Sequence, residues 1–321
     1  MRVDIDQIKA GAPLGFGLYR SDTSAGRVLG LAPDQEFTSE LKKELIEAGK
    51  PMYMIGSERE GYLAHLETNF DEIIRALQHD PQKATQVAHD LTRHVMEKVM
   101  DSPNAHNVHQ ATRLIRGTVD LIIASQEALF SLLLLAEHDY YTYTHSCNVG
   151  LFGTGLVKSL IGEGLQVDAQ TLGAAFFFHD IGKSEVGLAI LNKPGPLDPE
   201  EKASMQQHTE MGLRILKRLN VLTTEARYVV FQHHERLDGS GYPQGLAGEA
   251  IHPFARICAI ADVYDALTSD RAYRPRMAPF EALSIMREKM ANHFDPEMLY
   301  RFIQMFQELA AREAAAGPKK G

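Results

Sequence analysis

The sequence lacks the cysteines that a protein stabilised by disulfides would need. Its 321 residues include only two, Cys147 and Cys258, which lie far apart and form no CxxC pattern. This spacing argues against a disulfide framework and against a thiolate zinc site, and it predicts a reducing compartment.

Long apolar runs are also missing. No segment reaches the roughly 18 uncharged apolar residues of a membrane span. The most apolar stretch, Leu121 to Ala136, is interrupted by Ser-Gln-Glu at 125–127 and is typical of a single core helix. Asp4 and Asp6 stand where a secretory signal would begin its apolar core. We therefore expect a cytoplasmic protein with no membrane span.

Positive charge is scarce, since 33 Lys and Arg residues stand against 42 Asp and Glu residues, for a net charge of -9. Affinity for a nucleic-acid backbone comes chiefly from clustered Lys and Arg. The balance therefore excludes a broad surface for polymeric nucleic acid but allows a small phosphorylated substrate met by a few local cations. Apolar residues make up 44% of the chain, enough for one large domain and a small one.

The first 66 residues differ from the rest in how their apolar residues are spaced. Short apolar runs separated by Gly, Asp and Ser clusters predict strands at Gly15–Tyr19, Val28–Leu31 and Met52–Ile55. Between them, Ser39–Ala48 has helical spacing, with Thr38 as its N-cap and Gly49 as its stop. Residues 1–66 are thus predicted to form a small α/β module.

From Leu66 onward, apolar residues recur every three or four positions, which predicts a mainly helical remainder. We expect a helical connector over residues 67–136 and a larger helical domain over residues 137–321, ending in a short flexible tail. The fold class predicted from these patterns is mainly α.

Histidine is abundant, with fourteen in the chain. Nine lie in polar surroundings and are expected on solvent-exposed faces: His65, His79, His89, His94, His106, His109, His138, His252 and His293. The other five lie beside carboxylates in apolar segments, at helix ends or in a glycine-rich turn: His145, His179, His208, His233 and His234.

The strongest local signal is the pair His179-Asp180, which interrupts the apolar run at 174–181. Buried ionisable groups are costly unless they are paired or bind a metal. A core histidine bonded to its neighbour would also explain the pair. Adjacent helical residues point about 100° apart, so an ion reached by both would have to lie at the helix end, where Gly182 predicts a turn.

Further donors are spread along the chain. We expect His208 on a helix opened by Asp198-Pro199, His145 on the helix Tyr143–Lys158, and Asp262 on the apolar helix Ala255–Leu267. The pair His233-His234 precedes an acid and a tight glycine-rich turn, which packing does not easily explain. Together these residues offer nitrogen and oxygen but no sulfur, a mixture that suits iron or manganese, and zinc less distinctively.

The chain resembles the HD-GYP family of bacterial cyclic di-GMP phosphodiesterases, a branch of the HD metal-dependent phosphohydrolases. The resemblance covers roughly Glu137 to Phe306 and is carried by two motifs, His179-Asp180-x-Gly182-Lys183 and His233-His234-Glu235-x-x-Asp238-Gly239-x-Gly241-Tyr242-Pro243. It implies that residues 137–321 form an HD-type, all-helical catalytic domain, preceded by the small α/β module.

The resemblance also implies roles for individual residues. The metal ligands would be His145, His179, Asp180, His208, His233, His234 and Asp262. They would hold two divalent ions, iron or manganese, with Asp180 bridging them. Lys183 would lie near the scissile phosphate and act in catalysis with Asp180, and the substrate contacts would be Lys183, Tyr242, Arg271 and Arg274.

Two features of the chain bear on these roles. Arg271 and Arg274 are three residues apart, so on a helical turn both could face one phosphate. Some family members hold a third metal with a glutamate one turn before the first histidine, where this chain has Tyr141. A phenol is a poor donor at neutral pH, and Asp139 would face away on a regular helix, so we predict a two-metal site.

The resemblance implies that a metal-activated hydroxide opens cyclic di-GMP to pGpG. Whether a second cut then gives GMP stays open. Nothing in the residues distinguishes cyclic di-GMP from a mixed cyclic dinucleotide. Two other readings stay open: an HD-type nucleotide phosphohydrolase of other specificity, and a weakly active sensor of cyclic dinucleotides. The N-terminal module would regulate the enzyme or bind a second copy or a signalling partner.

Overall fold

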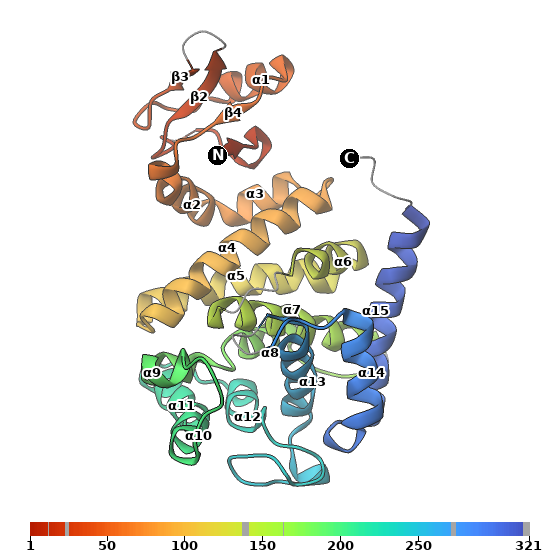
Figure 1. Ribbon diagram of the computed structural model, residues 1–321. Coiled ribbons are helices and arrows are strands. Elements are labelled where there is room, and N and C mark those ends of the chain that lie inside the picture. The colour runs from red at the N-terminus through yellow and green to blue at the C-terminus, as the bar shows by residue number, and fades with distance from the viewer. Residues whose placement is uncertain (12, 23–25, 137–140, 163, 271–273, 317–321) are drawn as a thin grey trace. The chain divides into compact units, whose positions relative to one another are not determined.

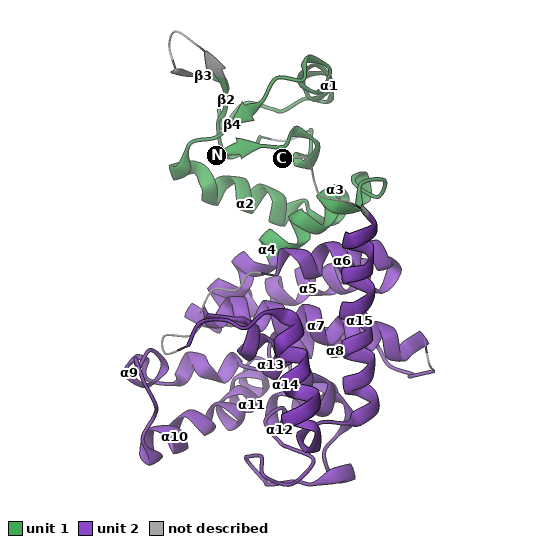
Figure 2. Cartoon of the chain, turned by 45° about the vertical axis from the view of Figure 1, so that its right-hand side comes forward, with its two compact units in different colours: residues 1–91 green, residues 92–321 purple. Residues whose placement is uncertain are grey.

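The computed structural model describes residues 1–321 except 12, 23–25, 137–140, 163, 271–273 and 317–321. The chain divides into two compact units, residues 1–91 and residues 92–321 (Figure 2). The segment expected to act as a connector, residues 67–136, is therefore shared between them. The boundary falls within the helix α4 (Pro81–Asp101).

The unit 1–91 contains a small antiparallel sheet. Its strands, in the spatial order β1-β4-β2-β3, are β1 (Arg2–Val3), β2 (Leu18–Asp22), β3 (Gly26–Leu31) and β4 (Met52–Tyr53). The second and third predicted runs overlap β3 and β4. The first was placed too early, because strand pairing begins only at Leu18, after the buried Phe16.

The predicted helix Ser39–Ala48 is confirmed as α1 with the expected bounds. The Thr38 side chain accepts a hydrogen bond from the backbone N–H of Leu41 (3.2 Å), which satisfies one of the free donors at the helix start. Gly49 ends the helix in the left-handed conformation (φ 59°), which glycine adopts without the strain of a Cβ atom.

The remaining elements of this unit are helical: η1 (Ile5–Gln7), η2 (Gly56–Glu58), α2 (Arg59–Thr68), α3 (Phe70–Ala76) and the first part of α4.

Three histidines expected on exposed faces are buried instead. They are His65 on α2 and His89 and His94 on α4. The prediction failed because their sequence neighbours are polar, whereas a helix buries residues by its period rather than by its neighbours.

His65 has a structural role. Its Nε2 accepts a hydrogen bond from the backbone N–H of Lys9 (3.2 Å), and its ring lies edge-on to Phe16. Burial, together with the charges of Lys9 and Lys42, lowers the pKa of His65 to about 4. At neutral pH the ring is therefore an uncharged acceptor.

We expect acid to loosen this unit through His65. Between its ordinary pKa of 6.5 and the folded value of about 4, the unfolded chain binds a proton that the folded unit does not, so stability is present above pH 6.5 and falls as the pH is lowered. Between pH 7.5 and 5 this amounts to about 2 kcal/mol. His65→Gln should remove that part of the pH dependence in denaturant titrations, whereas His79→Gln, at an exposed site, should not. Equal slopes for His65→Gln and the unaltered chain would contradict the assignment.

The unit 92–321 is helical, which confirms the mainly α fold class. After the end of α4 its elements are α5 (Ala105–Ala124), α6 (Gln126–Leu135), α7 (Thr142–Gly162), α8 (Ala169–Phe177), η3 (Ile181–Glu185), α9 (Leu188–Leu191), α10 (Pro199–Gln206), α11 (His208–Arg218), α12 (Thr224–Gln232), η4 (Gly248–Ala250), α13 (Pro253–Thr268), α14 (Pro279–Lys289), η5 (Ala291–His293) and α15 (Pro296–Ala316).

The helix α7 lies at the centre of this unit and contacts α5, α6, α8, α13 and α15 (Figure 1). Every residue from Thr144 to Val157 is buried. A Cβ atom on Gly150 would lie 2.4 Å from the ring of Phe177, and one on Gly153 would lie 2.8 Å from Phe176. These glycines let α7 and α8 pack closely, which brings the start of α7 near the end of α8.

Two helix predictions need correction. The apolar stretch Leu121 to Ala136 is not one helix: Ser125 ends α5 and caps α6, its side chain accepting from the backbone N–H of Ala128. The ammonium group of Lys158 donates to the carbonyls of Ile122 and Ile123 and so satisfies the end of α5.

The second correction concerns the helix opened by Asp198-Pro199. It is the short α10, with a full capping box between Asp198 and Glu201. It ends at Gln206, so His208 begins a separate helix. Among the described residues, no helix combines the length and the hydropathy that a membrane crossing requires.

Candidate metal centre

The His179-Asp180 pair lies at the end of a helix, as the sequence predicted. The helix α8 stops at Phe177, and the chain tightens into the 3-10 turn η3. Both side chains are fully buried. A Cβ atom on Gly182 would lie 1.9 Å from the carbonyl oxygen of His208, so only glycine allows this turn to pack against the start of α11. This contact brings His208 to the pair.

His233 and His234 follow the last turn of α12, where the chain enters the glycine-rich loop. Glu235, the next residue, is buried and accepts backbone hydrogen bonds from Gln244 (2.8 Å) and Leu246 (2.9 Å). Its carboxylate therefore fixes the loop rather than facing the histidines.

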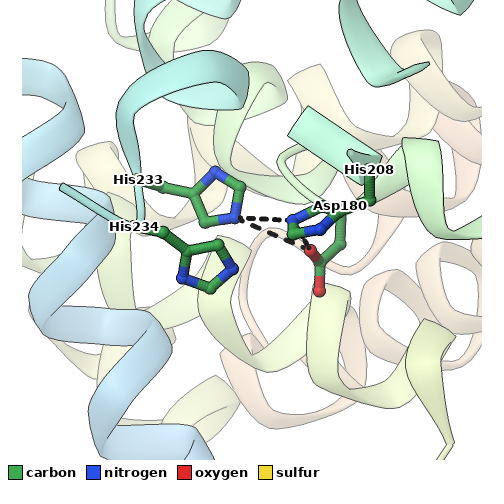
Figure 3. A group of neighbouring side chains, drawn as sticks. All are labelled: Asp180, His208, His233 and His234. Carbon is green, nitrogen blue, oxygen red and sulfur yellow. Dashed lines mark hydrogen bonds and ion pairs between the residues drawn. The ribbon is translucent and has the colours of Figure 1, made fainter. Parts of the chain in front are cut away.

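Asp180 stands between two sets of donors. Its Oδ1 lies 3.2 Å from Nε2 of His208 and 3.7 Å from Nε2 of His233 (Figure 3). Its Oδ2 lies 3.3 Å from Nε2 of both His145 and His179. One carboxylate thus faces a different pair of imidazoles with each oxygen.

Asp262 on α13 completes the arrangement. Its Oδ1 lies 3.3 Å from Nε2 of His145, and its Oδ2 lies 3.4 Å from Nδ1 of His234. We call His145, His179, Asp180 and Asp262 the first ligand group. The second ligand group is Asp180, His208, His233 and His234, whose donor atoms all lie within 4.8 Å of one another. The structure thus brings together all seven residues singled out in the sequence.

The electrostatics of the centre follow from this crowding. Burial disfavours a charged Asp180, yet Lys183 and the surrounding histidines hold its pKa well below the usual range. Burial lowers the pKa of His208, His233 and His234. At neutral pH these three rings are uncharged, which is the state in which an imidazole can bind a metal.

The residues fit a pair of divalent cations. Donor atoms bound to one ion at about 2.1 Å lie about 3 Å apart, close to the separations around Asp180. Among the described residues, Nε2 of His179 and Oδ1 of Asp180 are buried and take part in no hydrogen bond. Such atoms are costly unless something satisfies them, and a cation between the two groups would do so.

Asp265 is a residue that sequence reasoning missed. It is fully buried on α13, and its Oδ2 lies 2.7 Å from Nδ1 of His145. Its other oxygen accepts a hydrogen bond from the amide of Asn148 (2.7 Å). The signal was present, because Asp265, like Asp262, is a carboxylate in an apolar helix. It lies outside the two motifs that carry the resemblance.

A cavity of about 660 Å³ opens onto the centre, a size typical of small-molecule sites. His145, His208, His234 and Asp262 line it together with other polar and apolar side chains, among them Lys183, Arg236, Tyr242, Leu197 and Met205. Its wall therefore combines the ligand groups with cations and apolar surface, as a phosphorylated substrate with bases would require.

The predicted substrate contacts are placed as follows. Lys183 forms an ion pair with Oδ2 of Asp180 and faces the cavity, and the ring of Tyr242 lies 4.6 Å from that of His234. Arg274 donates to the carbonyls of Ala266 (2.7 Å) and Leu267 (3.1 Å), near the end of α13. Arg271 lies outside the described residues.

The predicted number of metal ions depends on which residues precede His145. Tyr141 lies one turn before His145, 59% exposed and stacked on Tyr143. Asp139, considered as a substitute for the missing glutamate, lies outside the described residues. The number of bound ions therefore stays a prediction.

Comparison with known proteins agrees with this geometry. A family model described as "HD domain" matches residues 155–298. A cyclic di-GMP phosphodiesterase of Pseudomonas aeruginosa is 40% identical over 183 residues, which cover 57% of this chain and 44% of the relative. A 3'3'-cGAMP-specific phosphodiesterase of Vibrio cholerae is 35% identical over 231 residues, covering 70% of this chain and 42% of the relative.

Among solved structures, an HDG"Y"P protein from Bdellovibrio bacteriovorus has a similar fold, with a TM-score of 0.65 and 18% identity. The match covers 96% of this chain and 99% of that protein. By contrast, the chain spans less than half the length of the two curated relatives just described.

Proposed function

We propose that this chain is a member of the HD-GYP family and a metal-dependent phosphodiesterase that hydrolyses a cyclic dinucleotide. The match to the HD domain model and the similarity to cyclic dinucleotide phosphodiesterases support this proposal. The observation that carries the proposal is the placement of Asp180 between two groups of imidazoles, beside a cavity that His145, His208 and His234 line. We propose a pair of divalent ions, iron or manganese, bound by the two ligand groups and sharing Asp180.

Two divalent cations at such a site would lower the pKa of a water between them and draw electrons from the phosphate oxygens. The chain's own residues supply orientation and charge. Lys183 places a cation at the cavity wall beside Asp180, where it can neutralise charge that builds on the phosphate. Arg236, which also lines the cavity, adds a second cation that can hold the other phosphate of a dinucleotide.

Tyr242 is proposed as a contact for the substrate rather than as an acid. Burial and the charges of Asp262 and Asp180 raise its pKa, so the phenol stays protonated and can donate a hydrogen bond. Tyr242→Phe should raise KM by about fivefold, the loss of one hydrogen bond of about 1 kcal/mol, and leave kcat nearly unchanged. Steady-state kinetics measure this. A fall in kcat at unchanged KM would instead assign the hydroxyl to the transition state.

We propose cyclic di-GMP as the substrate, opened to linear pGpG; a second cut to GMP is a further step that the assay below tests with pGpG. The Pseudomonas relative is named for cyclic di-GMP and supports this choice, whereas the Vibrio relative is named for 3'3'-cGAMP. A mixed cyclic dinucleotide is therefore the second candidate. Both substrates carry two phosphodiesters in one ring, so the same centre could open either.

The test uses the full chain, stripped of metal and then loaded with Mn²⁺ or, without oxygen, with Fe²⁺. Turnover of cyclic di-GMP, 3'3'-cGAMP, linear pGpG and a panel of mononucleotides is followed by chromatography. We expect hydrolysis of a cyclic dinucleotide that needs metal and stops when a chelator is added. Hydrolysis confined to mononucleotides would favour a phosphohydrolase of other specificity, and tight binding without product would favour a sensor.

We further propose that the N-terminal module regulates this activity or binds a second copy or a signalling partner. The proposal concerns residues 1–66 and rests on their separate strand-containing architecture. Unchanged rate, affinity and oligomeric state after deletion of these residues would rule it out.

A further inference from the structure

Asp265 is held by three side-chain contacts beside the first ligand group. It lies one turn after Asp262 on α13 and is fully buried. Its Oδ2 contacts Nδ1 of His145 (2.7 Å) and accepts from the hydroxyl of Ser269 (3.2 Å), and its Oδ1 accepts from the amide of Asn148 (2.7 Å). Because both oxygens are engaged, the carboxylate cannot turn away from His145.

The partner of His145 differs in kind from those of three other histidines in the centre. Nδ1 of each of these three lies 2.7–3.1 Å from backbone carbonyl oxygens: His179 from that of Phe176, His208 from that of Met205, and His233 from those of Val229 and Val230. A carbonyl and a carboxylate both fix the ring with Nε2 turned toward the ion. Only the carboxylate adds a full negative charge, which makes Nε2 a stronger donor.

We propose that Asp265 is a positioning residue that sets the metal affinity of the first ligand group and leaves the second largely unaffected. The inference rests on the proposed metal-dependent function. Among the four metal-facing histidines whose Nδ1 partners are given above, His145 alone relies on a carboxylate, and it belongs to the first ligand group. The two ion positions therefore differ in strength, and Asp265 is one cause of the difference.

The proposal predicts a selective loss. Asp265→Asn keeps the shape of the side chain but removes its charge, and its new amide group must face either His145 or Asn148, which now donate to this carboxylate. Loss of such an outer partner typically weakens metal binding about 10–100-fold. One ion should weaken by that factor, and the ion held by His208, His233 and His234 should stay.

The experiment titrates metal-free full-length chain with Mn²⁺ alone, without substrate. Calorimetry gives the number of ions and their affinities, and electron paramagnetic resonance distinguishes a coupled pair of Mn²⁺ ions from a single one. We expect two ions in the unaltered chain and one tight ion in Asp265→Asn. Because no turnover is measured, a chain that binds metal but hydrolyses no cyclic dinucleotide still tests the proposal.

The matched control is Thr268→Val, a buried change on the same helix that removes only a hydrogen bond to the carbonyl of Tyr264. It should keep both ions. Affinities within threefold of the unaltered chain in Asp265→Asn would overturn the proposal, and so would the loss of both ions together while circular dichroism reports a folded protein. An unaltered chain that takes up no Mn²⁺ would overturn the metal site itself.

If Asp265→Asn does not fold, Asn148→Ala provides a second variant. It leaves the charge in place and removes one of the bonds that hold it, so the same single ion should weaken about threefold to tenfold. Ser269→Ala, which removes the longer bond, should weaken it less. Unchanged binding of that ion in both variants would overturn the proposal.

Discussion

Replacing Asp180 with asparagine is expected to abolish turnover and to empty at least one ion position. Asp180 offers one oxygen to each ligand group, and both oxygens lie 3.2–3.3 Å from imidazole nitrogens. An asparagine keeps the volume but presents only one neutral oxygen, so it cannot bridge two cations. We expect kcat to fall on the order of a thousandfold, as when a main electrostatic stabiliser of a transition state is removed.

The measurement pairs cyclic dinucleotide turnover with metal analysis of the same sample. Asp120→Asn is the control, because Asp120 is an exposed carboxylate that accepts a hydrogen bond from Gln170 (2.7 Å) away from the centre. It should keep both ions and the full rate. Two bound ions and more than about a tenth of the rate in Asp180→Asn would show that Asp180 is not the bridge.

Local signals in the sequence predicted much of the fold. The helix Ser39–Ala48 was correct to the residue because Thr38 and Gly49 fix its ends through bonds that depend on nearby residues alone. The break at Ser125 was missed, although serine is a common N-cap, because the apolar residues on both sides continue in helical spacing. Only packing of α5 and α6 as separate helices shows where one ends.

The residues of the candidate site were predicted more completely than the ends of the helices, because ionisable side chains are costly to bury unless they are paired or bind a metal. Seven side chains from separate segments of the chain meet within a few ångströms: His145, His179, Asp180, His208, His233, His234 and Asp262. The partners of these residues were harder to predict. Whether Asp265 faces His145, or Glu235 faces the loop, depends on how α7 meets α13 and how the chain turns after His234.

The roles of Glu235 and Gly241 illustrate the same limit. In the sequence, Glu235 directly follows two histidines, yet its oxygens accept hydrogen bonds from the backbone of the loop. A Cβ atom on Gly241 would lie 2.5 Å from the carbonyl oxygen of His234. This part of the motif therefore fixes the backbone that places Tyr242 at the cavity wall. The candidate metal donors are the two histidines that precede it.

The second large effect is expected for Lys183→Met, which should lower kcat about a hundredfold while both ions remain bound. Lys183 pairs with Oδ2 of Asp180 and also faces the cavity, so its cation can reach a substrate phosphate. Methionine keeps the apolar length of the side chain and removes only the charge. Loss of one fixed cation near a developing phosphate charge costs on the order of a hundredfold in rate.

The ion content decides between two roles for Lys183. If it stabilises the transition state, Lys183→Met keeps two ions and loses kcat. If it serves only to offset the charge of Asp180, two cations bound there already do so, and the rate should hardly change. Lys193→Met is the control, since Lys193 also lines the cavity but pairs with Glu201, outside both ligand groups. A loss of kcat as large in Lys193→Met would mean that the summed positive charge of the cavity matters, rather than the position of Lys183 beside the bridging carboxylate.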